Sequence, residues 1–93
     1  MFDWDKDNIA HIAANGVVPI EAEQVIGNNP IDLHPQQHES EERILQVGVT
    51  DALRVLVVVS TWRDDHIRVV TAYPAPPHLR EFYFAEKAGF YDP

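Results

Sequence analysis

Residues 53–73, which read LRVLVVVSTWRDDHIRVVTAY, decide the fold of this 93-residue chain. The first half of the stretch predicts a long strand over residues 53–62, because β-branched residues dominate it. The run over residues 57–59 is apolar at every position, which is typical of a central strand buried on both faces. The second half predicts another strand over residues 66–73.

A tight turn at Asp64 and Asp65 would join these two strands as a hairpin. The turn lacks the glycine of the strongest hairpin signal, which leaves a longer loop open as an alternative. A two-residue turn would also fix the register of the two strands. The cross-strand pairs would then be Trp62 with Ile67 and Thr61 with Arg68.

The remaining elements follow from caps, breakers and helical periodicity. Asp5 or Asp7 can cap a first helix, which Asn15 and Gly16 end. Pro19 favours the first position of a second helix. The expected elements are a short strand over 2–4, helices to Ala14 and over 19–26, a polar loop over 34–42, a strand over 43–48 and, after the hairpin, a helix over 77–87 that Gly89 closes.

This order, strand–helix–helix–strand–strand–strand–helix, predicts an α+β fold with a small antiparallel sheet flanked by helices. The helices are expected on one face of the sheet, which would leave the other face open for function. A chain of 93 residues buries enough surface for one core and not for two. A single domain over residues 1–93 is therefore expected.

Negative charge is concentrated in the first part of the chain. Fifteen acidic and seven basic residues give a formal net charge of −8. Residues 1–42 carry nine acids and one base, whereas all five arginines lie in residues 43–93. This balance argues against tight non-specific binding to nucleic acid, but it allows a local arginine site and a basic partner. The simpler explanation is that acidity aids solubility.

Several classes of chemistry are excluded by what the sequence lacks. It has no cysteine, so it forms no disulfide, offers no thiolate nucleophile and has no cysteine-ligated zinc. No apolar run approaches the length of a transmembrane helix, and residues 1–5 lack the basic and apolar parts of a signal peptide. A cytoplasmic protein without membrane contact is therefore expected.

Four blocks of residues stand out by their order and spacing. They are Phe2-Asp3-Trp4-Asp5 with Asn8, His11, Asn15-Gly16-Val17 and residues 21–25; Glu41-Glu42-Arg43 with Val47-Gly48; residues 54–59 with Trp62-Arg63 and residues 67–72; and Arg80 with Tyr83. Together they resemble the BrnT toxins of type II toxin–antitoxin systems, over nearly the whole chain. Many members have His where this chain has Asn15, and Arg where it has Tyr73.

The resemblance implies a fold like that of the RelE ribonucleases. It implies an endoribonuclease toxin that cleaves RNA without a metal ion or other cofactor and thereby inhibits translation. It also implies a BrnA-like ribbon-helix-helix antitoxin as partner, with DNA contacted only through that antitoxin. Under the alternative, which Tyr73 and the acidic composition favour, the chain is a catalytically inactive binding partner of such a DNA-binding regulator.

Metal-independent cleavage of RNA needs a base, an acid and a cation that stabilises the phosphorane. Arginine suits the last role because its guanidinium stays charged and matches the geometry of phosphate oxygens. The candidates are Arg43 and Arg68 for the phosphate, Glu42 or His66 for proton transfer, and Arg63, Arg80 and Tyr83 for contact with RNA.

Most of these candidates also have an ordinary structural explanation. Arg68 could instead form an ion pair with a carboxylate such as Glu42, and Arg43 could form a surface salt bridge beside the same residue. Arg63 fits a solvated turn residue, and His66 fits an exposed histidine without a role. Both explanations stay open from the sequence.

Weaker signals come from three other histidines and from Tyr83. His11 lies four residues after Asp7 on the first helix, where a structural hydrogen bond is favoured over a place on an RNA-facing surface. His34 and His38 flank the polar loop, but their spacing is not that of a zinc motif, and no metal site is expected. Tyr83 is expected to pack against the sheet with its hydroxyl exposed.

Overall fold

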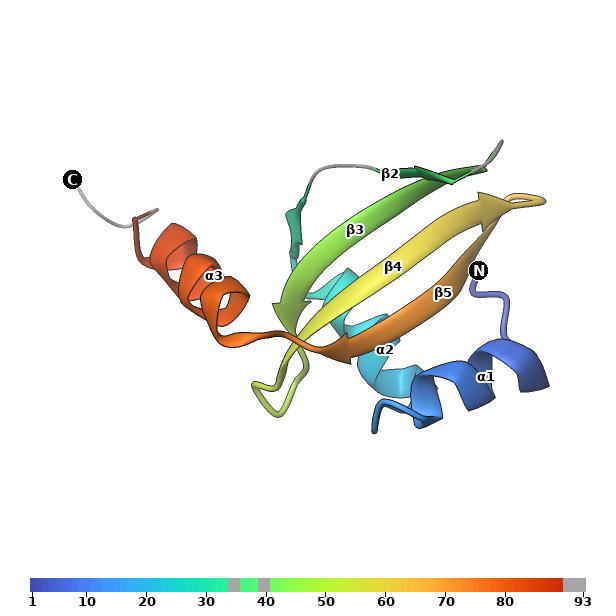
Figure 1. The fold of residues 1–93 in the computed structure, drawn as a ribbon, viewed down its shortest axis with the longest axis horizontal. Coiled ribbons are helices and arrows are strands. Elements are labelled where there is room, and N and C mark those ends of the chain that lie inside the picture. Colours follow the sequence, from blue (N-terminus) through green and yellow to red (C-terminus); the bar gives the residue numbers. More distant parts are fainter. Residues whose placement is uncertain (34–35, 39–40, 90–93) are drawn as a thin grey trace.

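The sheet is built around β4 (Val55–Arg63), which lies between β3 (Glu41–Val49) and β5 (His66–Pro74) in the computed structural model (Figure 1). Two short strands, β1 (Ile31–Asp32) and β2 (Gln36–His38), each pair with β3. The pairs of strands are antiparallel. Together with the helices, this sheet makes an α+β fold, as predicted.

Three helices occur in residues 1–33, 36–38 and 41–89, which are the residues that the structure describes. They are α1 (Lys6–Ala13), α2 (Pro19–Gly27) and α3 (Pro77–Gly89), and they confirm the predicted helices. Asp5 caps α1 by accepting hydrogen bonds from the backbone N–H groups of Asp7 and Asn8. None of these described helices is long and apolar enough to cross a membrane.

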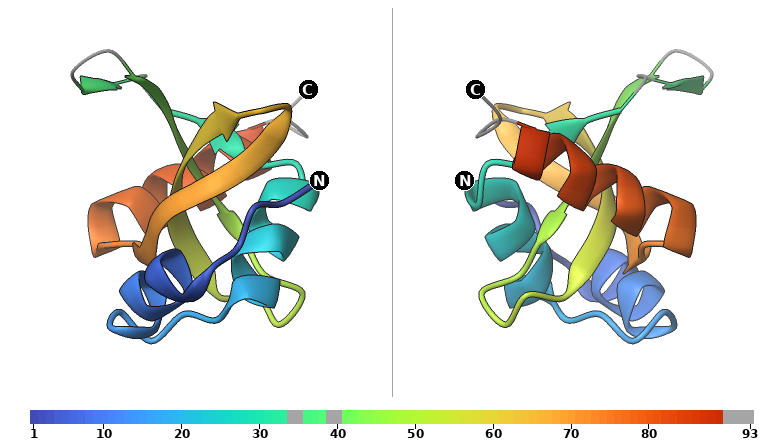
Figure 2. Two further views of the ribbon diagram at one scale, coloured as in Figure 1. Left: turned by 90° about the vertical axis from the view of Figure 1, so that its right-hand side faces the viewer. Right: turned by 90° about the vertical axis from the view of Figure 1, so that its left-hand side faces the viewer.

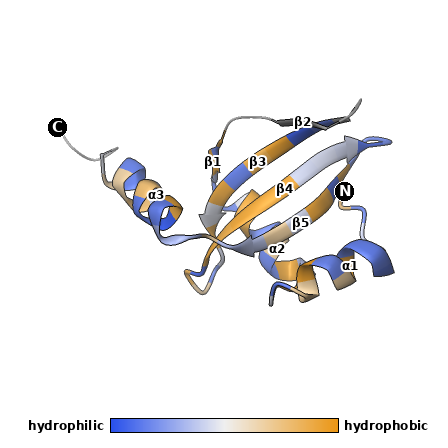
Figure 3. Cartoon of the chain, viewed as in Figure 1, coloured by the Kyte–Doolittle hydropathy of each residue, from blue (hydrophilic) through white to orange (hydrophobic). Residues whose placement is uncertain are grey.

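β4 is a central strand, buried on both faces as predicted. Its residues 55–61 are all buried, and neighbours such as Val57 and Val58 point to opposite faces. Figure 3 shows that the hydrophobic part of β4 is its first half. The strand begins two residues later than predicted, because Leu53 lies in a turn with a φ of 65° and is 73% exposed.

The predicted hairpin is confirmed. Asp64 and Asp65 form a two-residue turn with φ angles of 53° and 64°. Positive φ at both central residues is the mark of a type I′ turn, whose twist matches that of the flanking strands. Asp tolerates this conformation without a glycine. The observed pairs include Trp62 with Ile67 and Thr61 with Arg68.

α1 and α2 pack against one face of the sheet (Figure 2). Ile12 of α1 and Val25 of α2 are fully buried there, and Trp4 packs against the same core. The buried residues of this core are Ile12, Val17, Ala22, Val25, Leu56, Val58, Val69 and Ala72. Burial of these apolar side chains holds the two helices on the sheet.

α3 packs against the other face, so the expectation that the helices share one face is wrong. Tyr83 is only 5% exposed and lies in a second apolar cluster with Val47 and Val57. The second face of β4 is as apolar as the first, and α3 buries part of it. Figure 1 shows α3 at the end of the sheet away from the 64–65 turn.

Two further predictions, a strand over residues 2–4 and a loop over residues 34–42, are also wrong. In place of a strand over residues 2–4, Phe2 forms an isolated parallel bridge with Ile67 at the edge of β5. The loop predicted over residues 34–42 contains β2 and the start of β3, because antiparallel pairing extends β3 beyond its apolar part. Residues 34–35 and 39–40 of that loop lie outside the described residues.

β3 and α2 approach each other closely at Gly48. A β-carbon at this position would lie 3.0 Å from Cβ of Pro30 and 3.1 Å from Cγ1 of Val25. Val25 is fully buried, so the neighbouring side chains have little room to move away. Glycine at position 48 therefore sets how near α2 lies to the sheet.

We expect Gly48→Ala to lower the free energy of unfolding by about 1–3 kcal/mol, because the added methyl overpacks the core. Urea unfolding followed by circular dichroism measures this change. Gly27→Ala is the matched control, since a β-carbon there meets no heavy atom within 4 Å. A Gly48→Ala protein as stable as the control would contradict the close packing of α2 on β3.

Candidate functional site

The register of the sheet places arginines from three strands on one face. Thr61 of β4 lies opposite Arg68 of β5. The pairing of β3 with β4 continues this row to Arg43, and directly opposed residues share a face. Arg63 lies two residues after Thr61 on β4 and therefore projects from the same face.

A shallow pocket of about 180 Å³ opens at these side chains, and we call it the arginine pocket. The sheet forms one wall and α1 forms the other. Three guanidinium groups at one pocket match an anion that carries several oxygens, such as phosphate. The lining residues are Arg43, Thr61, Arg63, Arg68, Val69 and Val70 from the sheet and Asp7, Asn8 and His11 from α1.

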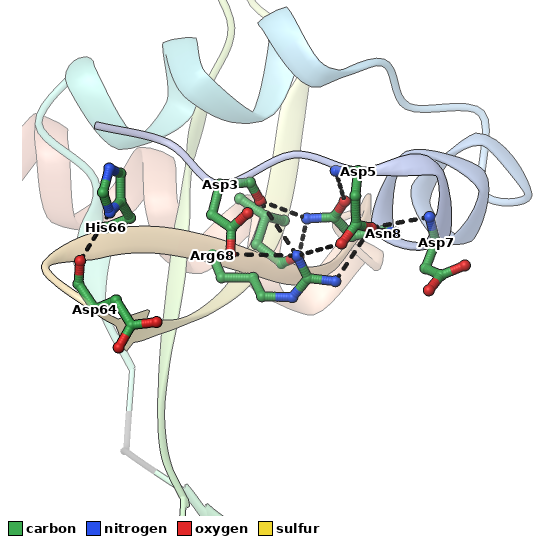
Figure 4. A network of polar contacts seen from close by, with 8 residues as sticks. Asp3, Asp5, Asp7, Asn8, Asp64, His66 and Arg68 are labelled. Carbon is green, nitrogen blue, oxygen red and sulfur yellow. Dashed lines mark hydrogen bonds and ion pairs between the residues drawn. The ribbon is translucent and has the colours of Figure 1, made fainter.

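Two carboxylates hold the guanidinium of Arg68 (Figure 4). Nη1 lies 3.0 Å from Oδ2 of Asp5 and 3.4 Å from Oδ2 of Asp3, and Nη2 donates to Oδ1 of Asp5 over 3.3 Å. Only 14% of the Arg68 side chain is exposed. An ion pair at Arg68 is therefore confirmed, but its partners are Asp3 and Asp5 rather than Glu42.

This ion pair shifts the pKa values of both partners. The hydrogen bond from Arg68, together with that from the backbone N–H of Asn8, holds the pKa of Asp5 below its ordinary value of 3.8. The same side-chain hydrogen bond raises the pKa of Arg68. Because Asp5 also caps α1, one carboxylate ties the start of the helix to β5.

Asn8 fixes the position of α1 beside the arginines. Its side chain is only 4% exposed, and Nδ2 donates to the carbonyl oxygens of Asp3 over 2.9 Å and Val69 over 3.1 Å. Its Oδ1 accepts a hydrogen bond from the backbone N–H of Asp5 over 2.8 Å. These bonds hold the N-terminal segment, α1 and β5 together around the arginine pocket.

The structure places the two predicted proton-transfer residues outside the lining of the arginine pocket. Glu42 has an exposed side chain, and its backbone oxygen accepts a hydrogen bond from the buried hydroxyl of Thr61. His66 lies at the hairpin end of β5, where its Nδ1 is 2.8 Å from the carbonyl oxygen of Asp64. His66 lines a second, neighbouring pocket, and Arg63 lines both.

The two candidates on α3 lie at the other end of the sheet. Tyr83 packs against the sheet as predicted, with its ring edge-on to Phe84 at 5.4 Å and Nζ of Lys87 5.6 Å from the ring centre. Arg80 is exposed on the same helix. The fold therefore brings Arg43, Arg63 and Arg68 together but does not bring α3 to them.

His11 is a lining residue that sequence reasoning placed in a structural role. It lies three residues after Asn8 and four after Asp7, so these side chains share one face of α1. This helical spacing could be read from the sequence, but it does not predict which strand that face of α1 contacts. The structure shows that this face meets β5 and that an exposed imidazole joins three arginines.

A metal site finds no support in the described parts of the chain, residues 1–33, 36–38 and 41–89. No group of three or more His, Cys, Asp and Glu side chains that could hold a metal ion occurs among them. His34 lies outside these residues, and for His38 the structure describes only the backbone.

We expect Asp5→Asn to remove an acid-sensitive part of the stability. The pKa of Asp5 lies below 3.8 in the folded protein, so its contribution is present above that pH and is lost as the pH falls through the folded value. The difference in free energy of unfolding between wild type and Asp5→Asn should therefore shrink as the pH falls below about 4.

Asn also caps helices, so this substitution tests the ion pair rather than the cap. Urea unfolding over a range of pH values gives the difference, and Asp65→Asn is the control for one lost negative charge at an exposed turn. A difference that stays constant into strong acid would contradict the ion pair between Asp5 and Arg68.

The family model described as "Ribonuclease toxin, BrnT, of type II toxin-antitoxin system" matches residues 4–78. The matched stretch contains α1, α2, the sheet and every residue that lines the arginine pocket. No curated protein and no solved structure matches the chain. Because the family match covers most of the sequence, the chain belongs to the BrnT family of ribonuclease toxins of type II toxin–antitoxin systems.

Proposed function

We propose that this chain is an endoribonuclease that cleaves RNA without a metal ion, with the scissile phosphate bound in the arginine pocket. The observation that carries the proposal is that one pocket gathers Arg43, Arg63 and Arg68 from three different strands. The family description, a ribonuclease toxin, agrees with this reading of the site.

The three arginines have different roles in binding the phosphate and stabilising the transition state. Arg43 and Arg63 contact its oxygens and stabilise the extra negative charge that develops in the transition state. Arg68 lies beside them in the same pocket, where its bonds to Asp3 and Asp5 keep it in place. Fixed charges of this kind need no reorganisation when the reaction occurs.

Proton transfer requires a base that reaches the 2′-hydroxyl and an acid that reaches the leaving 5′-oxygen. His11 is the imidazole that lines the arginine pocket, so we add it to the candidates. His66 lies two residues before Arg68 on β5 and can serve as the second group. Glu42 stays a candidate from the sequence, at the start of β3 beside Arg43.

The partner of the toxin is a BrnA-like ribbon-helix-helix antitoxin in this proposal, and both act in the cytoplasm. The first 42 residues carry a net charge of −8, from nine acids and one base, which favours a basic segment of the antitoxin as the contacting part. DNA is contacted through the antitoxin and not by the acidic toxin itself.

A second candidate function is a binding protein that has no cleavage activity. It is favoured by the carboxylates of Asp3 and Asp5, which already occupy the guanidinium of Arg68. Under this proposal the arginine pocket is a structural feature, and the chain acts only by binding a DNA-binding regulator.

Cleavage of a labelled RNA by the purified chain in the presence of EDTA tests the first proposal. We expect Arg43→Ala and Arg63→Ala each to lower the cleavage rate by about 100-fold or more, because each removes a cation from the transition state. Lys6→Ala is the matched control, since it removes an exposed cation from α1 that does not line the pocket.

Growth of a bacterial host after induction of the chain alone gives a second readout. Arrest by the wild type, relieved in the Arg43→Ala variant while that protein stays folded, supports the ribonuclease. A folded wild-type chain that leaves RNA intact and growth normal would instead support the binding protein.

A further inference from the structure

A second pocket adjoins the arginine pocket at the hairpin end of the sheet. It has a volume of about 380 Å³ and is lined by Phe2, Asp3, Trp4, Arg63, Asp64 and His66. Arg63 lines both pockets, and Asp3 lines this one while pairing with Arg68 of the other. The two pockets are therefore neighbours along one surface. We call this one the aromatic pocket.

The N-terminal wall of the aromatic pocket is held in place by backbone hydrogen bonds. The N–H of Asp3 donates to the carbonyl oxygen of Ile67 over 2.8 Å, and the N–H of Ile67 donates to that of Met1 over 2.8 Å. Phe2, between them, forms the bridge to Ile67. The backbone that carries the Phe2 ring is thus attached to the edge of β5.

The indole of Trp4 is fixed by a hydrogen bond of its own side chain. Its Nε1 donates to Oε2 of Glu23 over 2.8 Å, and the ring packs against the main core. Neither Phe2 nor Trp4 is fully buried, so part of each side chain is left for the pocket. A wall with fixed aromatic rings binds a flat ligand at a low cost in conformational entropy.

His66 also lines the pocket, at the start of β5 and next to Asp64 of the turn (Figure 4). The hydrogen bond between its Nδ1 and the carbonyl oxygen of Asp64 sets the orientation of the imidazole, which is exposed. Exposed histidine, phenylalanine and tryptophan rings are the side chains on which unstacked RNA bases stack.

The spacing of His66 and Arg68 along β5 is similar to the length of one nucleotide. His66 and Arg68 are two residues apart on β5, so their Cα atoms are separated by about 6.6–6.8 Å. That is close to the separation between a nucleotide's base and its phosphate. A phosphate at Arg63 and Arg68 would therefore place an adjoining base beside Phe2, Trp4 and His66.

We infer that the aromatic pocket binds a nucleobase of the single-stranded RNA whose phosphate occupies the arginine pocket. This inference rests on the proposed function, since it takes the phosphate site as given. Asp3 and Asp64 line the pocket as well, which disfavours a second phosphate there and leaves the base as the fitting group. The pocket then selects single-stranded RNA, because a paired base cannot enter it.

Nuclear magnetic resonance titration of the ¹⁵N-labelled chain tests the inference. Cytidine 5′-monophosphate is the probe, and ribose 5-phosphate is the matched ligand that has a phosphate but no base. We expect both to shift the amide signals of the arginine pocket. Only the nucleotide should also shift those of Phe2, Trp4 and His66 and the indole N–H signal of Trp4.

Phe2→Ala should weaken binding of the nucleotide about 5-fold or more and leave binding of ribose 5-phosphate unchanged. His66→Ala provides a second variant and should also weaken binding of the nucleotide. His78→Ala, an exposed histidine at the start of α3, is the matched control for His66→Ala and should change neither affinity. Equal affinity for the two ligands, or no shift at the hairpin end at millimolar nucleotide, overturns the inference.

The titration separates this inference from the proposed function, because it measures binding and not cleavage. Cleavage of RNA by a chain whose aromatic pocket gives no response to nucleotide would overturn the inference alone. A nucleotide-specific response in a chain that leaves RNA intact would support the aromatic pocket and overturn the ribonuclease.

Discussion

The buried amide of Asn8 is the contact on which the candidate site depends. Its two donors are both used, on the backbone oxygens of Asp3 and Val69, and so it joins the N-terminal segment to β5 at the point where α1 begins. Moving α1 away would leave buried polar groups unpaired, which is costly. His11 and the carboxylate of Asp5 therefore stay beside Arg68, and the arginine pocket keeps its second wall.

The proposed phosphate site holds three arginines and several carboxylates of an acidic chain close together. Three neighbouring guanidinium groups repel one another, and the carboxylates of Asp3, Asp5 and Asp7 offset part of that repulsion at the pocket. At physiological salt, exposed charges more than about 8 Å away are largely screened. The remaining acids of residues 1–42 therefore oppose non-specific binding of RNA more than binding at the pocket itself.

Local patterns predicted the helices, β4 and the hairpin, because each depends on neighbouring residues. These signals all lie within a few positions: the cap at Asp5, the proline at the first position of α2 (Pro19), the apolar run at 57–59 and the Asp64–Asp65 turn. The features that the sequence did not predict depend on contacts between residues far apart in the chain. β1 and β2 are defined by pairing with β3 rather than by any pattern of their own, and the partners of Arg68 lie more than sixty residues before it.

The candidate site was predictable in its residue types and not in its arrangement. The register of the hairpin placed Thr61 and Arg68 together, but nothing in the sequence said that α1 would add His11 beside them. The N-terminal segment contributes to both pockets, since Asp3 pairs with Arg68 of the arginine pocket and also lines the aromatic pocket. Contacts to phosphate position a nucleic acid, whereas contacts to bases select it. Under the two proposals, loosening the N-terminal segment weakens binding of both the phosphate and the base, whereas a change at Arg43 on β3 affects only the phosphate.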